Sequence, residues 1–223
     1  MATFTARGTS FQQSTGNLTL DVPSGTVDGD IMFLAYTRQN ANGYTLDASW
    51  IPIASKLIVG TYLFHLFYKI ANSEPASYSL TSGFGARSVG WIFSAYGGFD
   101  STNPIDSFSN TEYSTADSIV RVASFSVASA NSILLTFAIQ STATNPTTCS
   151  VATSPNTFTE HYDGGGATGR GWLQISSLKW TSSGATGDID ITSSFATSTN
   201  KHGFGVSLNP EVLANKSNFF QFM

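Results

Sequence analysis

Short apolar or alternating segments recur along the whole chain, and their periodicity predicts β-strands. Residues 17–22 alternate apolar and polar side chains before a turn signal of Pro, Ser and Gly. Residues 31–36 form a continuous apolar run, as in a strand that is buried on both faces, and residues 131–140 resemble it. Helix signals are nearly absent, so the pattern predicts an all-β protein.

Residues 61–70 form the most aromatic segment, and alternation divides its side chains between two faces. One face is purely apolar or aromatic, and its members are Tyr62, Phe64, Leu66, Tyr68 and Ile70. We expect this face to meet the core, which leaves His65 on the opposite side of the strand.

The strand-like segments return in the same order in the second part of the chain. Five pairs of segments carry this repeat, at an offset that grows from about 100 to 113 residues, as insertions would cause. The pairs are 29–36 with 131–138, 50–55 with 158–163, 61–70 with 171–180, 75–80 with 186–191, and 88–98 with 201–210.

The repeat predicts an antiparallel β-sandwich that is jelly-roll-like and built from two similar halves of about five strands each. We place the halves at about residues 14–98 and 118–210, inside a single domain of residues 1–210, and expect them to complete one core. The Ser-, Thr- and Asn-rich stretch 99–117 is expected to be a connecting loop, and residues 1–13 show no clean pattern.

The composition argues against nucleic-acid and membrane partners. Charged residues make up 11% of the chain, against about 25% in a typical domain, so the polar surface must come mainly from Ser, Thr, Asn, Gln and Gly. The net charge is -4 and the 10 Lys and Arg are scattered, so no basic face for nucleic acid is expected. The longest apolar run is too short to span a bilayer and no signal peptide is evident, which predicts synthesis in the cytoplasm without a membrane anchor.

Several motifs resemble chemical signatures but lack the required context. Residues 164–171 contain a literal GxGxxG, yet a strand-like segment follows instead of the helix that a dinucleotide site needs. Asp188 and Asp190 point to one face, but calcium takes six or more oxygens and no second acidic cluster accompanies them, so an exposed polar face is favoured. Cys149 stands in a Thr-rich stretch that we expect to be a loop, and as the only cysteine it rules out an internal disulfide.

The three histidines, His65, His161 and His202, are each isolated in the sequence. His161 follows Glu160 and lies near Asp163, but a Ser-His-Asp set is always conceivable in a Ser-rich chain. No G-x-S-x-G elbow, HExxH motif or Cys/His metal spacing occurs. We therefore predict that the protein is not an enzyme and has no catalytic residues, no metal and no cofactor.

Aromatic residues in or near the expected loops are the remaining candidates for a binding site. Tyr44, Trp50, Tyr113 and Tyr162 could stack their ring faces on a glycan, as in carbohydrate-binding jelly rolls. Packing in the core or at an interface is the favoured alternative. Tyr44 and Tyr162 are the two residues that we would test for glycan binding.

Several motifs together resemble a family of β domains found in tailed-phage virion proteins and in large bacterial surface proteins. The matching pieces are VDGDIMFLAY at 27–36, Trp50 with Ile53 and Ala54, LFYKIANSEPASYSLTS at 66–82, WIFSAYGGFDSTNPIDS at 91–107 and NSILLTFA at 131–138. The second half departs from the family, because Phe158 stands where a Trp is frequent and LQISSLKW has no EPASY-like continuation.

The resemblance implies a β-sandwich with a structural or adhesive role, and it transfers no catalytic residues. Pro104 and Asp106 are expected to be architectural, as a rigid corner and a turn-capping acceptor. We expect a virion protein, a capsid decoration or cement protein that stabilises the shell by binding neighbouring capsid subunits as a homo-oligomer. The alternative is a tail-associated receptor-binding or carbohydrate-binding adhesion module.

The C-terminal tail, residues 211–223, lies outside the repeat and is apolar at its end. Its candidate partner-binding residues are Phe219, Phe220, Phe222 and Met223. Exposed apolar termini are unfavourable in water, so the tail is expected either to pack on its own domain or to dock on a capsid or tail protein of the same particle.

Overall fold

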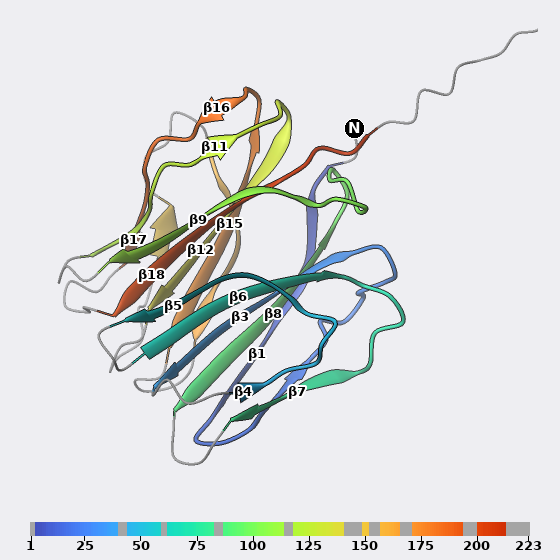
Figure 1. Ribbon diagram of the computed structural model, residues 1–223, viewed down its shortest axis with the longest axis vertical. Helices are drawn as coiled ribbons and strands as arrows, with labels where there is room; N and C mark the ends of the chain where they lie inside the picture. The colour runs from blue at the N-terminus through green and yellow to red at the C-terminus, as the bar shows by residue number, and fades with distance from the viewer. Residues whose placement is uncertain are drawn as a thin grey trace, which may run out of the picture.

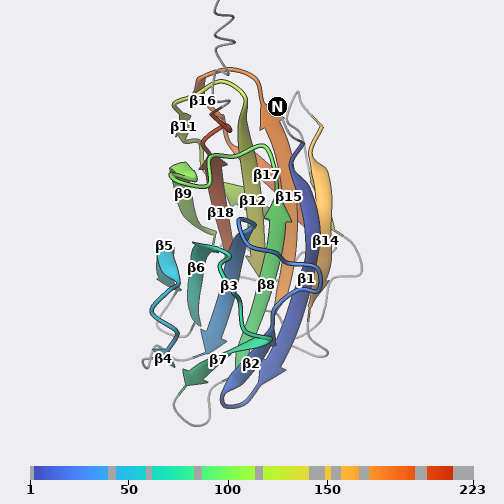
Figure 2. The same cartoon turned by 90° about the vertical axis from the view of Figure 1, so that its right-hand side faces the viewer.

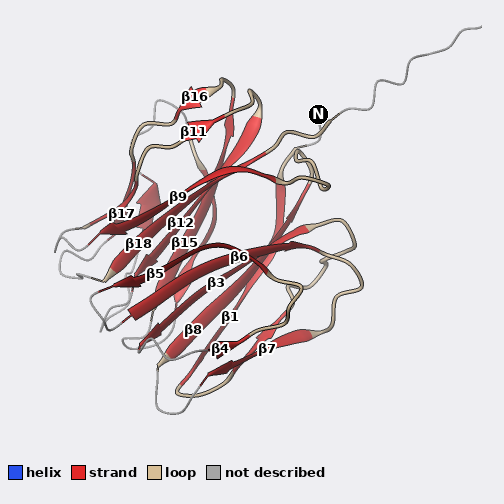
Figure 3. Cartoon of the chain, viewed as in Figure 1, coloured by secondary structure: helices blue, strands red, loops and turns tan. Residues whose placement is uncertain are grey.

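The computed structural model describes residues 3–39, 44–58, 62–82, 87–113, 118–140, 149–151, 157–165, 171–193 and 200–212. Every regular element within these ranges is a β-strand (Figure 3), which confirms the predicted all-β class. No helix in this part of the chain is long and apolar enough to cross a membrane.

The first half of the chain forms a five-stranded antiparallel sheet that a three-stranded sheet covers on one face. The larger sheet has the order β1 (Thr5–Ser14), β8 (Ser88–Tyr96), β3 (Ile31–Gln39), β6 (Tyr62–Ile70) and β5 (Ile51–Ile58). The smaller sheet has the order β2 (Leu18–Asp21), β7 (Ser77–Ser82) and β4 (Tyr44–Thr45).

The second half forms an equivalent pair of sheets. Its larger sheet has the order β14 (Thr159–Gly165), β15 (Trp172–Trp180), β12 (Ser132–Gln140), β18 (Lys201–Leu208) and β9 (Ile105–Tyr113). Its smaller sheet has the order β10 (Ile119–Val122), β17 (Ile189–Ser193) and β13 (Cys149–Val151). A short added pair joins β11 (Ser126–Val127) to β16 (Gly184–Ala185).

Each half has the strand order of a jelly roll. In the first half, β1, β8, β3 and β6 are neighbours in one sheet, and β2, β7 and β4 form the other. β5 joins the larger sheet beside β6 instead of completing the smaller one. All five sequence correspondences join strands at equivalent positions of the two halves, so the jelly-roll-like fold built from two similar halves is confirmed.

The two five-stranded sheets pack face to face across the seam between the halves. Equivalent edge strands lie at opposite edges of this pair of sheets, so that β5 lies beside β9 and β1 lies beside β14 (Figures 1 and 2). Aromatic and branched side chains from both sheets form one central cluster there, which includes Phe33, Phe64, Leu66, Trp91, Phe93, Leu135, Phe137, Ile139, Ile175, Phe204 and Val206. The rings of Phe33 and Phe137 meet across the seam with centroids 5.2 Å apart.

Each half also has an outer cluster between its larger and smaller sheets. The first contains Leu18, Leu20, Met32, Leu34, Tyr36 and Ile92, and the second contains Val120, Val122, Leu134, Ala138, Ile189 and Ile191. These residues explain why the segments in β3 and β12 read as continuous apolar runs, because both of their faces are buried.

The sequence pattern did not predict two of the edge strands. The stretch 99–117 was expected to be a loop, but β9 occupies part of it and pairs along β18. Residues 1–13 showed no clean pattern, but β1 pairs with β8 along its length. An edge strand with half-buried side chains can carry polar residues at most positions, so neither strand needs apolar alternation.

The predicted division of residues 61–70 is confirmed. Phe64 and Leu66 are fully buried in the central cluster, with Tyr62, Tyr68 and Ile70 packed against it. His65 lies on the other face, against the rings of Tyr44 and Phe67.

The alignment of this segment with residues 171–180 is shifted by one residue from its expected register. Ile31 pairs with Ile70 in the first half, whereas the equivalent Ile133 pairs with Lys179 in the second. Ile70 therefore corresponds to Lys179, although the sequence suggested Lys69. Because side chains alternate along a strand, Lys69 and Lys179 point to opposite faces of their sheets.

Candidate functional site

The residues of the EPASY motif form a closed network within the first half. The Lys69 ammonium lies 2.9 Å from a Glu74 carboxylate oxygen and donates hydrogen bonds to the hydroxyls of Tyr78 (2.6 Å) and Ser49 (3.0 Å). Burial disfavours the charged ammonium, but the bonds to Tyr78 and Glu74 outweigh it and raise the pKa of Lys69. Trp50 packs its ring edge-on against Tyr78. These contacts join β6 to β7.

Three acidic side chains singled out in the sequence have internal partners. Asp106 accepts a hydrogen bond from the Ala128 backbone amide at 2.9 Å, which agrees with its expected capping role. Asp190 accepts two bonds from Arg121, at 2.6 and 2.7 Å, and Asp188 accepts one from the Ser124 amide at 3.0 Å. The described residues contain no group of three or more potential metal ligands.

Tyr44 is a half-buried packing residue in the described structure. Its ring lies against Tyr36, His65 and Phe67, and its hydroxyl lies 2.5 Å from His65 Nδ1. Burial raises the pKa of Tyr44 to about 12 and lowers that of His65 to about 4. The ring face that a glycan would need is therefore engaged within the protein.

The low pKa of His65 predicts acid sensitivity. The unfolded chain binds a proton at His65 near pH 6.5, whereas the folded chain does so only near pH 4, so stability falls as the pH drops from 6.5 to 4. The loss is at most about 3 kcal/mol. Urea unfolding at pH 7, 5.5 and 4 measures it, and His65→Gln should flatten the dependence. An equally steep dependence in His65→Gln would show that another group is responsible.

Tyr162 is half-buried and packs against the central cluster, and burial raises its pKa. It therefore does not lie beside Tyr44, which packs over the outer face of the first half. The glycine-rich stretch 164–171 leads from β14 into another strand, β15, as the loop interpretation expected. Cys149 begins β13, so the expected loop is a strand at that position. The tail residues Phe219, Phe220, Phe222 and Met223 lie outside the described part of the chain.

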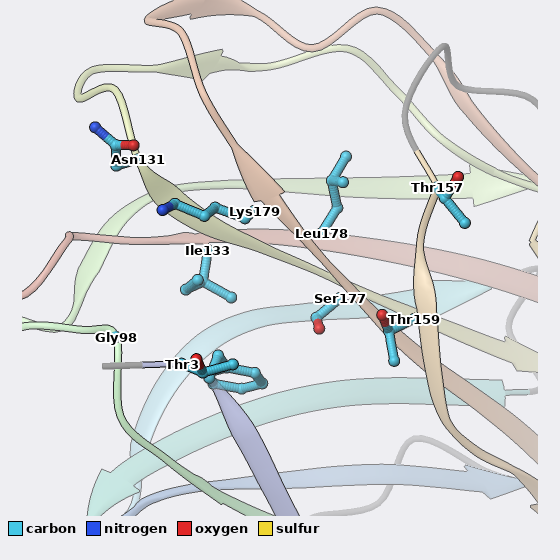
Figure 4. Close-up of a pocket in the computed structure, with 10 residues that line it drawn as sticks. Thr3, Gly98, Asn131, Ile133, Thr157, Thr159, Ser177, Leu178 and Lys179 are labelled. Carbon is cyan, nitrogen blue, oxygen red and sulfur yellow. The ribbon is translucent and has the colours of Figure 1, made fainter. Parts of the chain in front are cut away.

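A cavity of about 350 Å³ opens at one end of the second half (Figure 4). Two of its walls are the end of β15, with Ser177 and Lys179, and the residues around the start of β14, with Thr157 and Thr159. The remaining lining residues are Thr3, Phe4, Gly98, Asn131, Ile133 and Leu178. In Figure 4 Lys179 extends toward the side of Asn131, and Leu178 points away from Ser177. Among the described residues, no acidic side chain lines this seam cavity.

A β-bulge places the side chain of His161 against Ser177, a residue of the cavity wall. Thr159 and Glu160 pair with Ser177 and Ser176, but the next paired residue of β14 is Tyr162, so His161 is the extra residue. Its Nε2 lies 2.6 Å from Ser177 Oγ, and its ring packs against Phe4 and Phe93 from the first half. Burial lowers the pKa of His161, so the imidazole is neutral at pH 7 and can orient the serine hydroxyl.

An equivalent cavity of about 380 Å³ lies in the first half, lined in part by Ser49, Ile51, Tyr68 and Ile70. The strand registers equate Ile51 with Thr159, Tyr68 with Ser177, and Ile70 with Lys179. A bulge at Ile53 in β5 matches the bulge at His161. Both halves thus have a hollow at this point. The first-half cavity also has polar lining residues, Ser49, Lys69, Asn72, Ser101 and Thr102, but Ile51, Tyr68 and Ile70 are replaced by polar residues in the second half.

The sequence singled out His161 but not Ser177, Thr159 or Lys179. The internal repeat could have identified them, because each of these polar residues of the second half stands where the first half has an apolar or aromatic residue. No protein-family model, curated protein or solved structure matches the chain.

Proposed function

We propose that this chain is a structural protein of a phage particle, a capsid decoration or cement protein that binds neighbouring capsid subunits. The observation that carries the proposal is the internal use of the EPASY motif, the motif by which the sequence resembles virion β domains. Trp50, Lys69, Glu74 and Tyr78 contact one another, and the charge of Lys69 is paired with Glu74, so the motif supports architecture rather than chemistry.

The distribution of charge supports the same proposal. Arg7 pairs with Asp30, and Arg121 pairs with Asp190, so these charged groups stabilise the fold itself. The described residues contain no group of three or more His, Cys, Asp or Glu side chains that could hold a metal ion. A surface rich in hydroxyl and amide groups suits contacts with neighbouring subunits, since burying it costs less than burying charges.

Imaging of purified particles that carry a labelled copy of this chain tests the proposal. Decoration predicts label over the whole shell, in a number of copies that follows the capsid symmetry. Removal of the protein should also lower the temperature at which particles release their DNA. A few copies confined to the tail would contradict the proposal.

Deletion of residues 219–223 is expected to reduce shell occupancy at least tenfold, because it removes Phe219, Phe220, Phe222 and Met223 together. Occupancy is measured by gel densitometry of particles after incubation with an excess of each protein. The thermal midpoint of the isolated protein should stay unchanged, which separates docking from folding. Unchanged occupancy would show that the tail takes no part in attachment.

A second candidate function is that of a receptor-binding or carbohydrate-binding module. The observation that favours it is the polar seam cavity, because jelly rolls include lectin domains and the cavity offers hydroxyl, amide and ammonium groups. Glycan binding by the isolated protein would support it, whereas Tyr44→Ala and Tyr162→Ala are expected to act through packing.

A further inference from the structure

Four matched positions in or beside the two cavities carry residues of different chemistry in the two halves. Ile51, Ile53, Tyr68 and Ile70 are apolar or aromatic, and their counterparts are Thr159, His161, Ser177 and Lys179. The first half shows that the fold accepts apolar residues at all four positions. The polar set is therefore not required for folding and is available for ligand binding.

We propose that the seam cavity binds a small saccharide that carries a carboxylate, such as a uronic acid. The inference rests on the second candidate function, glycan binding, and gives its ligand class. It does not depend on where the protein sits in a particle.

Hydroxyl and amide groups around the cavity suit a sugar ring. Thr157, Thr159 and Ser177 supply hydroxyls that both donate and accept hydrogen bonds, and Asn131 supplies an amide. His161 holds the Ser177 hydroxyl at 2.6 Å and so fixes its orientation before a ligand arrives. A preoriented group loses less entropy on binding than a free one.

One wall is apolar, and one cation is present. Phe4 and Ile133 provide the apolar surface on which the C–H face of a sugar packs. Lys179 is exposed, and it forms no ion pair with any residue in the described part of the chain. Since the described lining residues include no carboxylate, a ligand carboxylate would be the natural partner of this ammonium.

The size of the cavity limits the ligand. A volume of about 350 Å³ lies at the lower end of the range for ligand pockets, which fits one or two sugar rings. A monosaccharide acid has few atoms, so its dissociation constant should be on the order of 1 mM.

Titration of the isotopically labelled full chain with glucuronate, glucose and acetate tests the proposal by NMR. Glucuronate should give saturable shifts at the amides of Thr159, Ser177 and Lys179, with affinity at least tenfold above that of glucose or acetate. Absence of saturable shifts at these residues would overturn the proposal. Equal affinity for glucose would overturn the role of the carboxylate, and equal affinity for acetate would overturn that of the sugar ring.

Two variants locate the site by copying the first half. Lys179→Ile and Thr159→Ile introduce the residues found at the equivalent positions, Ile70 and Ile51, so both should fold. Lys179→Ile should weaken glucuronate binding about tenfold. The matched control is Arg87→Met, which removes one exposed positive charge beside the opposite end of β8. Unchanged binding in Lys179→Ile, or equal loss in Arg87→Met, would also contradict the proposal. A negative titration leaves the particle-imaging result untouched, so the two failures are distinguishable.

Discussion

Gly203→Ala is expected to lower the free energy of unfolding by more than about 3 kcal/mol. An added Cβ at Gly203 would lie 2.2 Å from the backbone oxygen of Arg121 and 3.1 Å from a methyl of Val122. The first of these atoms belongs to the backbone of β10, so rotation of a side chain cannot relieve the overlap. Either β10 moves away from β18 or the second outer cluster loses its packing.

The equivalent glycine of the first half provides an internal comparison. A Cβ at Gly90 would lie 2.8 Å from Leu20 Cδ1 and 3.3 Å from Leu18 Cδ1, and both of these atoms can move. Gly90→Ala should therefore cost about 1–3 kcal/mol, less than Gly203→Ala. The close approach of β2 to β8 in the first half, and of β10 to β18 in the second, thus makes glycine necessary in both halves. The steric limit is stricter in the second half.

Urea unfolding followed by tryptophan fluorescence measures both costs, since the chain has 4 Trp. Gly16→Ala is the matched control, because the nearest atom to its added Cβ is 4.0 Å away and belongs to a local serine side chain. The expected order of loss is Gly203, Gly90 and then Gly16, with almost no loss at Gly16. An unfolding midpoint for Gly203→Ala equal to that of Gly16→Ala would contradict the close approach of β10 to β18.

The sequence predicted those parts of the fold in which burial imposes a strict pattern. The alternation over residues 61–70 placed Phe64 and Leu66 in the core because a strand turns successive side chains to opposite faces. The repeat predicted two similar halves because both must build the same two-sheet unit. It could not predict β1 and β9, whose half-buried positions accept polar residues, or the one-residue shift between β6 and β15.

The seam cavity needed the folded structure. Its walls come from residues as distant in sequence as Phe4 and Lys179, and no local pattern reports such contacts. The bulge that turns His161 toward Ser177 adds one unpaired residue to an edge strand, a feature that periodicity does not encode. The relevant sequence signal was the replacement of apolar or aromatic residues of the first half by polar residues at matched positions of the second half. These positions can be matched only once the strand registers are known.

Lys69→Met is expected to destabilise the protein by about 3 kcal/mol. The side chain of Lys69 is 10% exposed and that of Glu74 is 7% exposed, so removal of the cation leaves a buried carboxylate without its ionic partner. The hydroxyl of Tyr78 also loses a donor, although it keeps its own bond to Glu74. Lys179→Met is the matched control, because that exposed lysine should be replaceable at a cost below about 0.5 kcal/mol.

A double-mutant cycle separates the ion pair from the packing of the lysine stem. If the unpaired carboxylate causes most of the loss, Glu74→Gln in the Lys69→Met background should restore about 1–2 kcal/mol, although the same change alone destabilises the protein. Urea unfolding at pH 7 of the four proteins gives the coupling free energy. Simple additivity of the two losses would mean that the motif stabilises the fold through apolar contacts with Trp50 and Tyr78. A strong coupling free energy between Lys69 and Glu74 would instead show the physical role of the EPASY motif. That role is to neutralise a buried lysine near the connection between β6 and β7.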